Sequence, residues 1–468
     1  MQKKQESKNL KNSIYDGAAY SAAVGAGESY VAPYAIFRGA TSGYLGLLSS
    51  FPALLSAIFQ LSAPYALNKF KNRKGLVLLA VFLNAFSWLL MLSTVLISSE
   101  IALFLLIIFF TSYAATNAFA GTLWSSWIAD LVPENIRGYF FGRRNAITQF
   151  VSLVSTLFAG VLLGLLQDGT TMMGFSILFF ASFIFRMVSL RFLKKIDDPP
   201  HSLRIKTENP LRFFKTRNTR EAKNVILLSA LFLFSATIAG PFFVAYMLKD
   251  LGFNYFEYTL VIIASSVARV IAMPYWGEIS SRFGNRIVLT LGAFFVSFIP
   301  LLWLLSRSVY IITLVEIFGG FVWAAFDLSI FNYLIGSVRR EEIPSYMGNY
   351  NFFTGIAKFI GPNIGALLIW NFSSTPLFGL IGIPAVILIS GIARFIVSLL
   401  IMALLKEQRL FLSTKNRPIL LNVMFLYPAR GLVHNIFVGF SMGRKIVKKG
   451  VEIASRKKYS FILLHALR

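Results

Sequence analysis

Long apolar runs separated by short polar connections make up most of this chain. Twelve runs have roughly the 20 residues that an α-helix needs to cross the hydrocarbon core of a bilayer. Their approximate bounds are 14–37, 42–66, 75–97, 101–128, 145–166, 172–193, 225–247, 254–277, 287–305, 309–336, 350–370 and 381–405. The pattern predicts an all-α membrane protein with twelve transmembrane helices.

The connections between these runs alternate in charge. One set is rich in lysine and arginine, as at 69–74 and 137–144, whereas the other carries only Arg38, Lys249 and Arg307. Because basic loops are retained on the cytoplasmic side of a membrane, we expect these loops and both termini in the cytoplasm. We expect an integral protein of the plasma membrane.

The second half of the chain repeats the first. Five matches keep the same order in both halves: Ala26-Gly27 with Ala239-Gly240, Lys69 to Arg73 with Arg282 to Arg286, Gly121 and Trp124 with Gly320 and Trp323, Gly142 and Asn145 with Gly348 and Asn351, and Ser182 and Arg186 with Ser390 and Arg394. The sequence therefore predicts two six-helix pseudo-repeats, a plan that secondary transporters use around a midplane cavity.

The repeat divides the chain into five segments. These are a cytoplasmic N-terminus at 1–13, a six-helix bundle at 14–193, a basic linker at 194–224, a second bundle at 225–405, and a basic cytoplasmic tail at 406–468. Within the tail, residues 429–450 mix apolar and basic positions. We expect an amphipathic helix there, lying on the membrane surface against anionic lipid.

The composition excludes several function classes. The chain has no cysteine and three histidines, all in polar or basic segments, so we expect no metal site and no cofactor. Its net charge of +25 belongs to loops and tail, so we expect no nucleic-acid partner. The expected partners are the lipid bilayer and a small-molecule substrate, and we expect a monomer. No G-x-x-x-x-G-K-(S/T) loop for ATP occurs.

The connections after spans two and eight resemble a loop motif of the major facilitator superfamily, G-x-x-x-D-(R/K)-x-G-(R/K)-(R/K). The second copy starts at Gly277 and contains Arg282, Gly284 and Arg286, and the first contains Asn68, Lys69 and Arg73. The motif's aspartate is replaced by Asn68 in one copy and Ser281 in the other. The resemblance therefore implies the superfamily's fold but does not carry a gate built on that aspartate.

A second resemblance follows span four. The segment Asp130 to Pro133, followed by Arg137 and Gly138, is similar to one that many members of the superfamily place there. The arginine of the superfamily's span-four pattern R-x-x-x-G is replaced by Asn117. The superfamily's glycine-proline signature of antiporters is not evident in span five, which makes exchange the less favoured mode. Together these resemblances imply a secondary active transporter.

Ionisable residues within spans are the first candidates for function, because burying them in a bilayer is costly. Glu28 lies near the middle of span one, close to Tyr30 and Tyr34. A carboxyl group that can load and unload a proton there suits proton coupling, and the two tyrosines are further candidates for solute or proton contact. The alternative is a structural carboxyl group, hydrogen-bonded to a hydroxyl group or to the partner bundle.

Glu316 and Asn117 occupy the same repeat position. We predict substrate or proton contact for Glu316, the alternative being an outer-leaflet acid paired with a neighbouring span. The amides of Asn117 and Gln149 can orient a polar solute, or they can bridge helices.

The C-terminal half contributes Asp327, Arg269 and Lys358. We expect these charges to neutralise one another, and the alternative is that the cations bind a carboxylate or phosphate group of the solute. For Arg186 and Arg394 we predict snorkelling to the cytoplasmic interface.

These observations predict a carrier and not an enzyme. We expect alternating access of a small organic solute, coupled to protons, with efflux left open as its direction. The alternatives are a non-transporting scaffold or receptor on the same fold and, with less support, a membrane-embedded lipid-processing enzyme.

Overall fold

The computed structural model describes residues 2–133, 136–166, 169–199, 220–336 and 343–405. The middle of the expected linker, 200–219, and the whole tail, 406–468, lie outside the described residues. The amphipathic helix expected in the tail therefore stays a prediction.

Helices account for nearly all of the described chain. The N-terminal half holds α1 (Gln2–Ala26), α2 (Val31–Phe37), α3 (Ser42–Phe70), α4 (Arg73–Ser93), α5 (Ser99–Leu131), α6 (Arg137–Leu165) and α7 (Thr171–Lys194). The C-terminal half holds α9 (Arg220–Ala239), α10 (Phe242–Ala245), α11 (Tyr255–Phe283), α12 (Asn285–Val296), α13 (Ile299–Leu304), α14 (Val309–Gly336), α15 (Ile343–Asn371) and α16 (Ile383–Leu404). The predicted all-α class is confirmed.

Eleven spans in the described part of the chain are long and apolar enough to cross a membrane, judged by length and composition. The expected first span is built from α1 and α2, and α1 starts with a polar stretch. A 3₁₀ turn at Glu28–Tyr30 separates the two helices.

Three expected spans are interrupted, and glycine or proline lies at each interruption. At Gly27 a side chain would collide with Ser182 and with the Trp88 ring. At the matching repeat position, Pro241 follows Gly240 and supplies no N–H donor, which ends α9 before α10 starts. The third interruption separates α12 from α13, where Pro300 sits in the first turn of α13.

The two halves are packed alike, as the repeat predicts. In the N-terminal bundle α1 packs against α6 and α7, and in the C-terminal bundle α9 packs against α15 and α16. The matched serines make matched contacts, because Ser182 Oγ donates to Ala23 O of α1 at 3.2 Å and Ser390 Oγ donates to Ser235 O of α9 at 2.6 Å.

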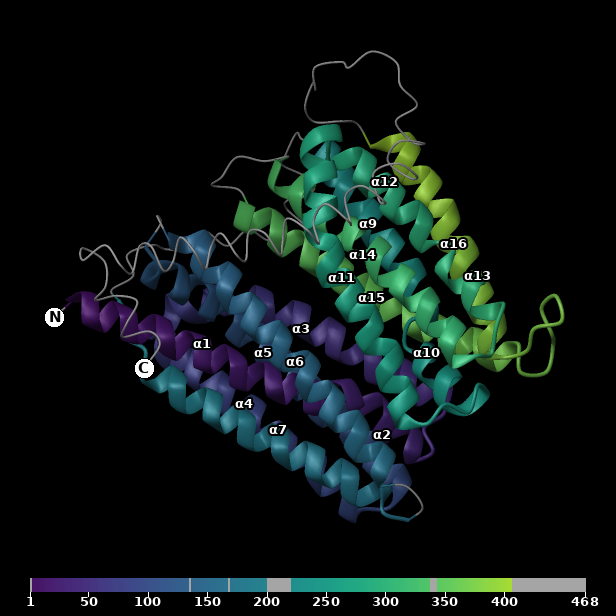
Figure 1. Cartoon of the computed structure of the whole chain (residues 1–468), viewed down its shortest axis with the longest axis horizontal. Coiled ribbons are helices and arrows are strands. Elements are labelled where there is room, and N and C mark those ends of the chain that lie inside the picture. The colour runs from purple at the N-terminus through teal and green to yellow at the C-terminus, as the bar shows by residue number, and fades with distance from the viewer. Residues whose placement is uncertain (1, 134–135, 167–168, 200–219, 337–342, 406–468) are drawn as a thin grey trace, which may run out of the picture.

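The bundles meet along a surface that we call the seam, formed by α3 with α15 and by α6 with α11. Figure 1 shows that the bundles lie together near α2 and α10 and diverge toward the end where the N-terminus lies. We call the diverging end the basic end and the other the opposite end. Small residues allow the close approach: a Cβ on Gly355 would lie 2.5 Å from Ala57 Cβ.

Hydrogen bonds join the two bundles toward the opposite end. The Tyr30 hydroxyl group donates to Thr156 O at 2.7 Å and lies 2.7 Å from Thr259 Oγ1 of the other bundle. The Tyr258 hydroxyl group donates to Ser29 O at 3.0 Å, and Lys249 Nζ donates to Ala40 O at 2.8 Å. These contacts hold the bundles together where they converge.

Candidate functional site

A cavity of about 430 Å³ lies inside the N-terminal bundle, between α1, α4, α5, α6 and α7. We call it the pocket. Several of its lining side chains are polar or charged, namely Asp16, Tyr20, Asn117, Trp124, Arg144, Gln149 and Arg186. The sequence singled out Asn117 and Gln149 as site residues, and both are among them.

Asp16 is the acid of the pocket, and its side chain is 4% exposed. Ser189 Oγ donates to Asp16 Oδ1 at 2.7 Å, and Arg144 Nη2 lies 3.8 Å from Asp16 Oδ2. Asp16 is absent from the residues predicted from the sequence because it sits beside the polar start of the first span. The spacing of these residues in the sequence could have revealed it. Asp16, Tyr20 and Val24 are four residues apart and therefore share one face of α1.

Arg144 is a second pocket residue that was not predicted from the sequence. The basic pattern at 137–144 indicates a loop, but α6 starts at Arg137, eight residues before the expected bound of 145. The guanidinium group of Arg144 stacks over Trp124, with Cζ 4.2 Å from the ring centroid. Its Nε donates to Ser13 O at 3.1 Å, and its side chain is 12% exposed.

The predicted snorkelling of Arg186 and Arg394 is wrong. Their exposed fractions are 5% and 4%, and both point into their bundles. Arg186 Nε donates to Asn84 Oδ1 at 2.7 Å, and its guanidinium group lies over Tyr20 at 4.5 Å. Arg394 Nη2 donates to Ala236 O at 3.1 Å. Neutral oxygen atoms inside the bundle thus replace the water that a snorkelling arginine would seek.

The two amides behave differently. Asn117 Nδ2 donates to the Tyr20 hydroxyl group at 2.9 Å, which ties α5 to α1 across the pocket. Gln149 is exposed and reaches the pocket from α6. Asn117 therefore bridges helices and also lines the pocket, whereas Gln149 lines the pocket from an exposed position.

Glu28, Tyr30 and Tyr34 do not line the pocket. Glu28 Oε2 accepts a hydrogen bond from the Tyr113 hydroxyl group at 2.8 Å, and Tyr30 belongs to the seam. The Tyr34 hydroxyl group lies 2.9 Å from Thr94 Oγ1, and the Tyr34 ring is fully buried. This geometry fits the structural alternative for Glu28, and its coupling role stays a prediction.

The acids of the C-terminal bundle have separate partners. Trp303 Nε1 donates to Glu316 Oε1 at 3.0 Å, so Glu316 faces α13. Asp327 Oδ2 and Arg269 Nη1 form an ion pair at 3.2 Å, with both side chains about two-fifths exposed. Lys358 is exposed and lies near enough to Asp327 for their charges to interact. The neutralising pair expected between Asp327 and Arg269 is present.

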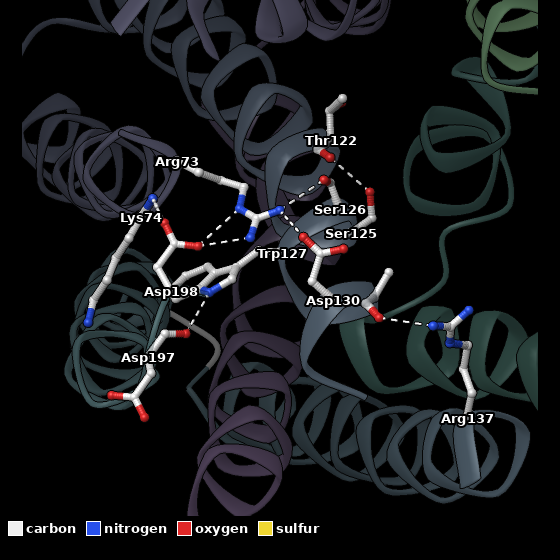
Figure 2. Close-up of polar contacts among 11 residues, drawn as sticks. Arg73, Lys74, Thr122, Ser125, Ser126, Trp127, Asp130, Arg137, Asp197 and Asp198 are labelled. Carbon is white, nitrogen blue, oxygen red and sulfur yellow. Dashed lines mark hydrogen bonds and ion pairs between the residues drawn. The ribbon is translucent and has the colours of Figure 1, made fainter. Parts of the chain in front are cut away.

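Arg73 organises the basic end of the N-terminal bundle, as Figure 2 shows. Its side chain is 1% exposed, and its guanidinium group binds Asp130 Oδ2 at 2.6 Å and Asp198 Oδ1 at 2.9 Å. Trp127 Nε1 also donates to Asp197 O at 2.8 Å. Two predicted loop residues, Arg73 and Asp130, therefore meet, and together with Asp198 they fasten the start of the linker to α4 and α5.

The remaining loop residues are less connected. Arg137 Nη2 donates to Ala129 O at 3.1 Å, Lys69 lies over the Phe70 ring at 5.6 Å, and Gly138 is exposed. Asn68 lies near the end of α3 and has a partner in the structure.

In the C-terminal copy, Arg282 pairs within its own helix, with Glu278 Oε1 at 2.5 Å from its Nη2. Arg286 Nη2 donates to Met402 O at 3.0 Å. Gly284 has φ +94°, a conformation that favours glycine, and Gly277 is a half-buried position of α11. The two copies of the motif therefore differ, because only Arg73 joins two aspartates.

The sequence model of the Major Facilitator Superfamily matches residues 18–234 and 225–443, one match for each half of the chain. The chain belongs to this superfamily. No curated protein sequence matches the chain.

Solved structures of superfamily transporters are similar to the chain in fold. A bacterial homolog of the human lysosomal transporter Spinster, inward-facing and occupied, gives a TM-score of 0.66 at 14% identity, over 84% of this chain and 95% of that one. A mutant of the nucleoside transporter NupG gives 0.63 at 13% identity, over 85% and 100%. The xylose transporter XylE from E. coli, partially occluded and inward open, gives 0.61 at 12% identity, over 88% and 99%. At such identities the likeness concerns the fold alone.

Proposed function

We propose that this protein is a secondary active transporter that moves a small organic solute by alternating access, and that the pocket forms the N-terminal half of its solute site. The pocket is the observation that carries the proposal. Its volume of about 430 Å³ falls in the range of small-molecule sites, about 300–1,000 Å³. It combines two arginines, an aspartate and two amides with aromatic faces.

The charge of the loops supports an orientation of the protein in the membrane. With the basic end in the cytoplasm, the described conformation has the two bundles in contact toward the outside and diverging toward the inside. Residues 14–193 and 225–405 would move as two bodies joined by the linker 194–224. The plasma membrane, a monomer, cytoplasmic termini and anionic lipid at the basic loops and tail complete the proposal.

Asp16 is our first candidate for proton coupling. It lines the pocket beside Arg144, so a solute that binds Arg144 changes the surroundings of the Asp16 carboxyl group directly. Glu28 and Glu316 are retained as further candidates, although they accept hydrogen bonds from Tyr113 and Trp303 outside the pocket. A group that both the proton and the solute reach is the simplest means of coupling the two.

A two-stage experiment tests the proposal. Thermal unfolding of the purified protein, screened against sugars, nucleosides, organic anions, amino acids and lipophilic cations, identifies the class that raises the midpoint, because binding stabilises the folded state. Flux of that class into proteoliposomes is then measured with and without a pH gradient. We expect gradient-driven flux, and we expect Asp16→Asn to abolish the response to the gradient. Glu28→Gln and Glu316→Gln are compared in the same assay.

Glu100→Gln is the matched control, because Glu100 is an exposed acid in the first turn of α5 and touches neither pocket nor seam. Its flux should equal that of the unmodified protein. A folded protein that carries none of the screened solutes would refute transport and support the scaffold or receptor alternative.

A further inference from the structure

The charges that line the pocket do not cancel. Asp16 supplies one negative charge, and Arg144 and Arg186 supply two positive charges. No other acidic or basic side chain of the described residues lines the pocket. The lining therefore carries one surplus positive charge inside a bundle, where screening is weaker than in water.

The hydrogen bonds of the two arginines show which one is available to bind a solute. Arg186 is held by Asn84 Oδ1 and by Ser189 Oγ, and Ser189 Oγ in turn donates to Asp16 Oδ1. Arg144 is held through Nε by Ser13 O, and its Nη2 stands 3.8 Å from Asp16, beyond hydrogen-bond distance. Among the described residues, none accepts a hydrogen bond from the terminal nitrogens of Arg144 within 3.5 Å.

We propose that the pocket binds an organic carboxylate, with Arg144 as the residue that contacts the carboxylate group. This inference rests on the proposed transport function and names its solute class. The two terminal nitrogens of a guanidinium group match the two oxygens of a carboxylate. One surplus positive charge also matches the single negative charge of a carboxylate more closely than the nearly double charge of a phosphate monoester.

The rest of the lining fits the body of such a solute. Trp124 lies under Arg144, and the ring of Tyr20 lies under Arg186, so both arginines are stacked and fixed in direction. Val77, Val81 and Val24 supply apolar surface, and Gln149 supplies an amide. The expected solute therefore has an apolar or aromatic body next to its carboxylate group.

The absence of cysteine from the chain allows a direct test of the pocket's charge. Gly121 lines the pocket, and a Cβ built there meets no described atom within 4 Å, so Gly121→Cys places a reporter thiol with little disturbance. The probes are the anionic 2-sulfonatoethyl and the cationic 2-(trimethylammonio)ethyl methanethiosulfonates. Each rate constant is divided by that of the same reagent with a free thiol. The ratio of the two cancels any change in thiolate fraction, which affects both reagents equally.

We expect the normalised ratio of anionic to cationic rate to be about ten or more at Gly121→Cys, and to fall about tenfold when Arg144→Gln is added. Arg143→Gln is the matched control, because Arg143 precedes Arg144 in the same helix, is exposed and does not line the pocket. It should leave the ratio unchanged, and Arg144→Lys should retain most of the preference.

A ratio at or below one at Gly121→Cys overturns the inference, and this result does not depend on whether Arg144→Gln folds. A ratio that Arg144→Gln does not change overturns the role of Arg144. An anionic preference in a protein without flux supports the pocket assignment and refutes transport. Flux of a neutral or cationic solute without an anionic preference leaves transport standing and refutes the carboxylate.

Discussion

A methyl group placed in the seam should push the two bundles apart. Gly160 of α6 faces Thr259 of α11, and a Cβ at Gly160 would lie 2.5 Å from Thr259 Cβ and 2.6 Å from Thr259 Cγ2. Real Cβ atoms essentially never approach other atoms within 3.0 Å, so Gly160→Ala forces a shift. Thr259 is fully buried and its hydroxyl group is bound to Tyr30, so its side chain cannot simply rotate away.

The cost falls on one conformation. Overpacking a close contact destabilises it by about 1–3 kcal/mol, and in the proposed transport cycle this contact is made only while the opposite end is closed. In that cycle, the conformation that is open at the opposite end lacks the contact and is not destabilised. Gly160→Ala should therefore shift the population toward that conformation by a factor of about 5–150.

Distances between spin labels measure this shift. Leu96 and Leu305 are highly exposed and lie on either side of the opposite end, so Leu96→Cys and Leu305→Cys give one label on each bundle in a chain that has no other cysteine. Gly160→Ala should increase the long-distance population. Gly164→Ala is the control one turn along α6, where a Cβ would stand 3.3 Å from Phe256 Cβ and needs only a small adjustment.

Thr259→Gly, added to Gly160→Ala, removes the colliding atoms and should move the distribution back toward the original, short of the part that the lost Tyr30–Thr259 hydrogen bond contributes. If Gly160→Ala leaves the distribution unchanged while the protein stays folded, the seam is not the surface that closes the opposite end, and the reasoning fails.

Three further substitutions have expected outcomes. Tyr30→Phe removes the hydroxyl group that bonds both bundles. It should change the free-energy difference between the two label-distance populations by about 1–3 kcal/mol, in the same direction as Gly160→Ala; an unchanged distribution would show that these bonds do not hold the seam. Arg73→Gln leaves Asp130 and Asp198 without their buried partner and should lower the free energy of unfolding by about 3 kcal/mol, seen as a lower thermal midpoint. Asp130→Asn, at a half-exposed carboxylate, should cost less, and the reverse order would contradict the network. Arg186→Gln should lower the midpoint because the amide of Asn84 loses a charged donor, with a stabilising contribution of about 1.5–3 kcal/mol, and a midpoint within error of the unmodified protein would restore the snorkelling interpretation.

The fold could be predicted from the sequence because the features that determine it are local and repeated. Apolar runs of bilayer length define the spans one by one, and the serine and arginine pairs of the two halves keep their order. In the structure Ser182 and Ser390 make equivalent bonds to the first helix of their bundles, so the repeat reflects packing.

Much of the candidate site could not be predicted from the sequence, for a physical reason. An arginine near the end of a span can reach water or can be satisfied inside, and one sequence does not show which partners will face it. Arg186 finds Asn84, 102 residues away, and Asp16 finds Ser189, 173 residues away. Arg144 was missed because basic residues at the start of α6 resemble a loop. The amides Asn117 and Gln149 were named from the sequence because amides are few within the predicted spans, and both line the pocket.

Alternating access itself is tested most directly by two label pairs measured on otherwise unmodified protein in proteoliposomes. Leu96→Cys with Leu305→Cys reports the opposite end, and Phe70→Cys with Leu404→Cys, at two further exposed positions, reports the basic end. The account predicts two populations at each end, with ratios that change together between neutral and acidic pH, so that the basic end closes as the opposite end opens. A single fixed distance at both ends under all conditions, or two ends that open together, would contradict it.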